Sequence, residues 1–151
     1  MVIPSEPIQV AAAVILEDDC YLITRRRSDT HCGDLWEFPG GKVLPGESLK
    51  ACLVREIREE LGIEIQVQEL METVLHSYPD LQVVLHFFRC VRLSGNPAAL
   101  GCAVFHWVPA EKFSQYPFPE ADALFLEKLK RFGDLEPDRK SLLQGQRKEV
   151  H

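Results

Sequence analysis

No stretch of this 151-residue chain is apolar for the roughly 20 residues that a membrane-spanning helix needs. Its first ten residues, MVIPSEPIQV, also lack the basic segment and the long apolar segment of a signal peptide. Blocks of Lys and Arg are missing too, because 17 basic residues face 23 acidic ones and the net charge is −6. We therefore expect a cytoplasmic protein without a membrane or nucleic acid polymer as partner.

Cysteine pairs of the CxxC type are absent, and the number of cysteines, five, is odd. This usage predicts reduced thiols rather than a disulfide framework. The chain has no internal repeat and no low-complexity tract, and 46% of its residues are hydrophobic. These features predict one domain over residues 1–133, followed by a polar, flexible tail over residues 134–151.

Hydrophobic periodicity divides the chain into strands and helices. The expected strands cover residues 8–16 and 20–27, which form a hairpin, then 63–78 and 81–93, joined near Pro79 and Asp80, and finally 103–108. The expected helices cover residues 48–61, ended by Gly62, and residues 120–132, with Leu124, Leu126, Leu129 and Phe132 as apolar residues. This order predicts an α/β fold in which a mixed sheet is packed between helices.

Three glutamates share one face of the expected helix over residues 48–61. At about 100° per residue, Glu59 lies about 60° to one side of Glu56, and Glu60 lies about 40° to the other. Carboxylates this close repel one another, and a divalent cation relieves that repulsion. Hard oxygen ligands favour Mg²⁺, with Mn²⁺ as a second candidate. Taken alone, the three glutamates also fit an ordinary solvated helix surface.

Neighbouring residues strengthen the interpretation as a metal site. Glu47 lies just before the helix and can reach the same region. Arg55 precedes Glu59 by four residues, a spacing at which the arginine can hold that carboxylate in one rotamer. The turn at Gly40 and Gly41 lets a backbone carbonyl approach the same ion, because glycine has no side chain to prevent it.

The wider spacing resembles a known family motif. Gly41 is followed after five residues by Glu47, and after seven more by residues 55–63, with the sequence REIREELGI. Every fixed position of the Nudix box is present, so the chain is identified by resemblance as a member of the Nudix hydrolase superfamily. The stretches LITRRRSDTHCGDLWEFPGGK and YPFPEADALFLEKL are similar to the corresponding segments of its MutT-like branch.

This resemblance implies an α/β/α sandwich with a mixed central β-sheet. It also implies a Mg²⁺-dependent pyrophosphohydrolase that converts an oxidised purine (d)NTP, similar to 8-oxo-dGTP, or a pyrimidine (d)NTP into (d)NMP and pyrophosphate. Glu56, Glu59 and Glu60 match the family's catalytic, metal-binding glutamates. The carbonyl of Gly40 matches its backbone metal ligand, and Arg55 matches the catalytic residue that orients the glutamates.

Three further residues match positions of the family's nucleotide pocket. Arg26 and Phe38 match residues that line it, and Asp122 matches the side chain that reads the edge of the base. A carboxylate suits that task because it accepts hydrogen bonds from base N–H groups. Asp122 also fits the N-cap of the last expected helix, and the two roles are compatible.

Two residues depart from the MutT-like pattern. Gly101 stands where many of these proteins carry another glutamate, and Leu81 stands where the bacterial 8-oxo-dGTP hydrolase has a pocket arginine. Gly101 leaves open a catalytically weak domain that binds nucleotides, and Leu81 leaves the base preference open. A hydrolase of another nucleoside diphosphate derivative is a further alternative, and the protein is expected to be a monomer or a homodimer.

Overall fold

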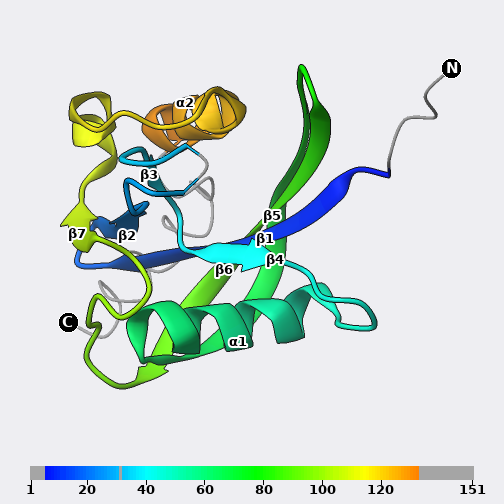
Figure 1. Cartoon of the computed structure of the whole chain (residues 1–151). Coiled ribbons are helices and arrows are strands. Elements are labelled where there is room, and N and C mark those ends of the chain that lie inside the picture. Colours follow the sequence, from blue (N-terminus) through cyan, green and yellow to red (C-terminus); the bar gives the residue numbers. More distant parts are fainter. Residues whose placement is uncertain (1–5, 31, 133–151) are drawn as a thin grey trace, which may run out of the picture.

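Two helices cover opposite faces of a mixed sheet, α1 (Leu49–Leu61) and α2 (Ala123–Phe132) (Figure 1). The computed structural model describes residues 6–30 and 32–132, so the tail expected over residues 134–151 lies outside the described residues. The layered arrangement confirms the predicted α/β/α sandwich. None of the helices in the described ranges is long and apolar enough to cross a membrane.

The hairpin predicted near the N-terminus is present as β1 (Ile8–Glu17) and β2 (Cys20–Arg25). Its turn uses Asp18 and Asp19, whose φ angles of 50° and 62° lie in the left-handed region. Aspartate tolerates this region because its short side chain can bond locally to the backbone. The end of β2 brings Arg26 to the cavity described below.

Strand β1 is the centre of the sheet. It pairs in parallel with β6 (Leu81–Ser94), and antiparallel with β2 and with β4 (Gly40–Lys42). The strand order is β3-β2-β1-β6-β5, with β3 at Trp36–Glu37 and β5 at Glu64–Tyr78. The predicted pairing of β5 and β6 is confirmed, and this long hairpin projects beyond the rest of the sheet (Figure 1).

Alternation along β1 divides the core between the two faces of the sheet. Ala11, Ala13 and Ile15 pack with the buried side chains of α1, whereas Ala12 and Val14 pack with those of α2. Because helices cover both faces, the apolar run in β1 is continuous rather than alternating.

Helix α1 begins and ends where the sequence signals place it. The Ser48 side chain accepts a hydrogen bond from the Ala51 N–H at 3.1 Å, and Gly62 ends the helix with a φ of 70°. Helix α2 begins later than expected, because Glu120–Asp122 forms a 3-10 turn, η2. Leu124, one of the apolar residues at the expected helical spacing, is 72% exposed, whereas Phe125 is fully buried.

Strand β7 (Val104–Val108) confirms the last predicted strand and pairs with β2. Three short elements were not predicted: β3, β4 and the 3-10 helix η1 (Ala110–Gln115). Strands of two or three residues carry no readable periodicity, and their backbone pairing to β1 and β2 defines them instead.

Candidate active site

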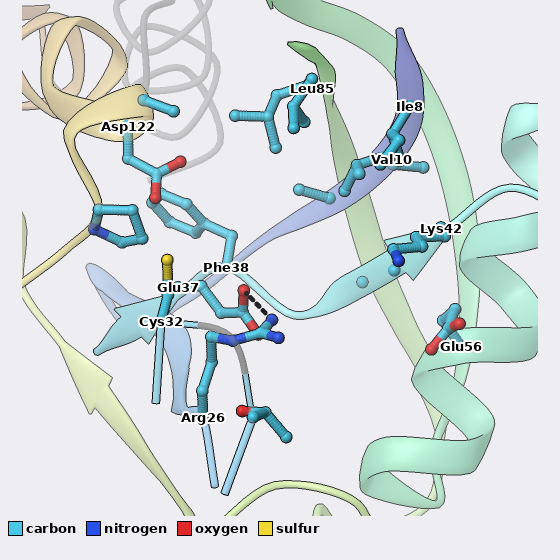
Figure 2. A pocket seen from close by; sticks show the side chains of 18 of the residues that line it. Ile8, Val10, Arg26, Cys32, Glu37, Phe38, Lys42, Glu56, Leu85 and Asp122 are labelled. Carbon is cyan, nitrogen blue, oxygen red and sulfur yellow. Dashed lines mark hydrogen bonds and ion pairs between the residues drawn. The ribbon is translucent and has the colours of Figure 1, made fainter. Parts of the chain in front are cut away.

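A cavity of about 590 Å³ lies between α1, β1, β4 and the η2 turn. Figure 2 shows Glu56 and Lys42 on one side, Arg26 and Glu37 in the middle, and Asp122 on the other side. We call the part around Glu56 and Glu60 the acidic end, and the part around Asp122 and Phe38 the Asp122 end. Residues far apart in the sequence therefore line one continuous space.

Glu60 is the most perturbed carboxylate of the acidic end. Burial, together with the charges of Glu37 and Glu56, raises its pKa to about 9, although a backbone hydrogen bond from Gly40 acts in the opposite direction. Glu56 lies in the same cavity, and burial raises its pKa as well. Two partly dehydrated acids therefore repel each other at this end of the cavity.

Gly41 makes room for the Glu56 carboxylate. A Cβ atom at position 41 would lie 2.3 Å from the Glu56 carboxyl carbon, closer than any real side chain allows. Gly40 is constrained in the same way, because a Cβ there would lie 1.9 Å from the carbonyl oxygen of Ala11. The two glycines thus allow β4 to pass between α1 and β1.

Arg55 ties together three carboxylates along α1 and the loop before it. Its Nε donates to Glu47 at 2.7 Å, and its Nη1 lies 3.2 Å from Glu56 and 3.3 Å from Glu59. The predicted i,i+4 contact with Glu59 is confirmed. The hydrogen bond from Arg55, together with one from the Leu44 N–H, lowers the pKa of Glu47 to about 2.

Glu59 is placed differently from its two neighbours. Its side chain is 58% exposed and contacts Arg55, and it is not among the residues that line the cavity. Of the three glutamates expected on one face, Glu56 and Glu60 thus point into the cavity while Glu59 lies at its outside.

A divalent cation fits the chemistry of the acidic end. In the part of the chain that the structure describes, no three His, Cys, Asp or Glu side chains converge closely enough to enclose a metal. Yet Glu56 and Glu60 are hard oxygen donors that are partly withdrawn from solvent and repel each other, and a cation would relieve that repulsion. Gly40 contacts Glu60 through its backbone, so it stands next to the same carboxylate.

Asp122 is a buried acid at the opposite end of the cavity. It is only 5% exposed, and burial raises its pKa to about 7, with a contribution from the charge of Glu37. It ends the η2 turn directly before α2, and its carboxylate lines the cavity. Phe38 also lines the cavity, and its ring packs edge-on against Phe87 and Phe125 in the core.

Glu37 is a pocket residue that the sequence analysis missed. Both of its carboxylate oxygens lie within hydrogen-bond distance of Arg26 Nη1, at 3.1 and 3.2 Å (Figure 2). Burial raises the pKa of Glu37, and Arg26 partly offsets this. No sequence pattern marks Glu37, because it lies on a two-residue strand that is too short to show periodicity. Its place in the pocket depends on the pairing of β3 with β2.

The two departures from the family pattern, Gly101 and Leu81, both line the cavity. Two cysteines, Cys32 and Cys102, line it as well, and all five cysteines are free thiols, as predicted. Arg27 lines the cavity from an exposed position, where it pairs with Asp29 at 3.7 Å.

The NUDIX domain family model matches residues 10–128, and the chain therefore belongs to the NUDIX domain family. The 8-oxo-dGTP diphosphatase of Escherichia coli (strain K12) is 34% identical over 125 residues, which cover 82% of this chain and 97% of that protein. The CTP pyrophosphohydrolase of the same organism is 38% identical over 120 residues, which cover 80% of this chain and 89% of that protein.

The solution structure of the E. coli ORF135 protein has a TM-score of 0.76 and 35% sequence identity, and the match covers 87% of this chain and 94% of that one. The fold and the enzyme class predicted from the Nudix box are confirmed: the chain is a Nudix hydrolase with a MutT-like fold.

Proposed function

We propose that this enzyme hydrolyses a nucleoside triphosphate to the monophosphate and pyrophosphate, with Mg²⁺ or Mn²⁺ held at the acidic end. One observation carries the proposal: a single cavity joins two half-buried acids that repel each other, Glu56 and Glu60, to a separate buried acid, Asp122. The similarity to proteins named 8-oxo-dGTP diphosphatase and CTP pyrophosphohydrolase supports the same class of substrate.

The phosphate chain is assigned to the acidic end. Glu56, Glu59 and Glu60 would hold the cation, with the carbonyl of Gly40 as a further ligand, and Arg55 keeps two of these carboxylates in place. When bound, the cation neutralises charge on the phosphates and positions a water molecule for attack.

Three cationic side chains of the protein also line the cavity, Arg26, Arg27 and Lys42. Arg26 is held by Glu37 with its guanidinium in the cavity, where it can donate to phosphate oxygens. These residues attract the phosphate chain to an enzyme whose overall charge is negative.

The base is assigned to the Asp122 end. The carboxyl group of Asp122 is buried, and a base edge that presents N–H groups would satisfy its acceptor oxygens. Phe38, Leu85 and Phe87 supply apolar walls on which a flat ring can pack. An oxidised purine or a pyrimidine meets both requirements, and removal of such a nucleotide before its incorporation would protect DNA.

A second function is favoured by Gly101. Since this position carries no carboxylate, a domain that binds nucleotides with little turnover is the alternative, and a nucleoside diphosphate derivative is the alternative substrate. The purified protein should be incubated with a panel of normal and oxidised (d)NTPs, and pyrophosphate release should be measured with and without Mg²⁺.

We expect metal-dependent release that is strongest for one base and absent from a Glu56→Gln preparation, which controls for contaminating enzymes. Nucleotide binding without pyrophosphate release would contradict the proposal and favour the binding domain. Release from a nucleoside diphosphate derivative alone would identify the alternative substrate.

A further inference from the structure

Residues 98–101, which we call the bracket, cross the C-terminal end of α1. The N–H groups of Leu100 and Gly101 donate to the carbonyl oxygen of Glu60 at 2.9 and 3.0 Å, and the Ala98 N–H donates to Leu61 at 3.0 Å. The last carbonyls of a helix have no partner within the helix. The bracket provides hydrogen-bond donors for two of these carbonyls, those of Glu60 and Leu61, and Glu60 belongs to the acidic end.

The residues that flank the bracket are anchored to the β1–β2 hairpin. On one side, Arg92 donates to the Gly95 carbonyl at 2.7 Å and forms a two-pronged ion pair with Glu17 of β1. On the other side, the Ala103 N–H donates to the carbonyl of Arg25 in β2 at 3.0 Å. The bracket therefore connects the helix end that carries Glu60 to the strand that leads into Arg26.

Gly101 touches Glu60 itself. A Cβ atom at position 101 would lie 3.3 Å from the Glu60 Cα and 3.5 Å from its Cγ. The first distance is tighter than most real contacts, and the neighbour is a helix backbone atom that cannot move alone. Gly101 also lines the cavity beside Glu60, so the stem of that side chain lies against the bracket while its carboxylate meets Gly40.

We infer that the bracket positions Glu60 for metal binding, and that Gly101 acts as a positioning residue rather than as a site of a lost ligand. The inference rests on the proposed function, because it assigns Glu60 to the cation. The bracket contributes backbone hydrogen bonds and close packing, and the close packing against Glu60 favours a residue without a side chain at position 101. The departure from the family pattern thus has a structural role in this chain.

The test is a direct titration of the metal-free protein with Mn²⁺. Electron paramagnetic resonance measures the free Mn²⁺ at each point of the titration and so gives the affinity. Gly101→Ala should weaken Mn²⁺ binding by about tenfold or more, the effect typical of lost support behind a metal ligand. Leu100→Ala is the matched control, because its side chain is 62% exposed and its N–H remains, so binding should stay at the wild-type level. Melting temperatures of the metal-free variants separate a positioning effect from simple loss of stability.

Arg92→Gln provides a second route if Gly101→Ala does not fold. It loosens the anchor at Gly95 without adding atoms near Glu60, and it should also weaken Mn²⁺ binding, by less than Gly101→Ala. The inference is overturned if a folded Gly101→Ala protein binds Mn²⁺ with wild-type affinity. If Gly101→Ala does not fold, wild-type affinity in Arg92→Gln overturns it.

Glu60→Gln distinguishes this failure from failure of the proposed function. If wild type binds Mn²⁺ and Glu60→Gln does not, the proposed metal site is supported. The result for Gly101→Ala then tests only the positioning role of the bracket. If wild type binds no Mn²⁺, or Glu60→Gln binds it equally well, the proposed metal site is wrong and the positioning role is refuted with it.

Discussion

The two ends of the cavity are built in different ways. The acidic end comes from one continuous stretch, residues 40–60, in which a glycine turn and a helix place their groups at fixed spacings. The Asp122 end collects Phe38, Leu85, Phe87 and Asp122 from three separate segments. Local geometry thus encodes the first end in the sequence, whereas the second exists only after the sheet and both helices have packed.

The largest effect should follow from disabling the acidic end. Glu56→Gln removes the charge that lies against Gly41 and pairs with Arg55, and we expect kcat to fall by about a thousandfold or more. The nearby control is Glu64→Gln, since Glu64 pairs with Arg58 on the surface and should leave kcat unchanged. Equal activity of Glu56→Gln and wild type in pyrophosphate release would remove Glu56 from the mechanism.

A smaller loss should follow from crowding the same carboxylate. Gly41→Ala places a methyl group where the Glu56 carboxylate lies, and we expect kcat to fall by about 10- to 100-fold. Gly46→Ala is the matched control, because no atom lies within 4 Å of its added Cβ although its φ is +77°. The control should lose about 1 kcal/mol of stability and keep wild-type kcat, as measured by thermal unfolding and steady-state kinetics.

Substitution at the other end should change selectivity rather than chemistry. Asp122→Asn keeps the shape of the side chain but replaces one acceptor oxygen by a donor, so kcat/KM should shift between bases by about 10- to 100-fold. Mn²⁺ affinity should remain at the wild-type value, because Asp122 lies away from the acidic end (Figure 2). An unchanged ranking across the nucleotide panel would show that Asp122 serves the fold alone.

The smallest effect concerns stability and its dependence on pH. The pKa of Asp122 is raised from 3.8 to about 7, so the folded state binds a proton more tightly than the unfolded state. The stabilisation of the folded state that protonated Asp122 provides is fully present below pH 3.8 and is lost as the pH rises through about 7.

Metal-free Asp122→Asn should therefore gain stability over wild type as the pH rises from about 4 to 7, by at most about 4 kcal/mol, with no further gain above pH 8. Thermal or urea unfolding across this range provides the measurement. A stability difference that is constant from pH 4 to 8 would show that the pKa of Asp122 is not raised.

Local sequence signals were sufficient to predict the layered fold, the hairpin of β1 and β2, helix α1 with its caps, and the spacing of the acids on that helix. These features depend on periodicity, capping and turn residues, which act over a few neighbouring positions. The i,i+4 contact between Arg55 and Glu59 belongs to the same group, because a helix brings such residues together whatever surrounds it.

The packing of distant segments sets which acids are withdrawn from solvent. Glu59 and Glu60 are adjacent in the sequence, yet one is exposed beside Arg55 and the other lies in the cavity under the bracket. The pairing of Glu37 with Arg26 likewise depends on the register between β2 and β3. Burial and pairing across elements depend on how distant segments meet, and neither residue type nor local spacing carries that information.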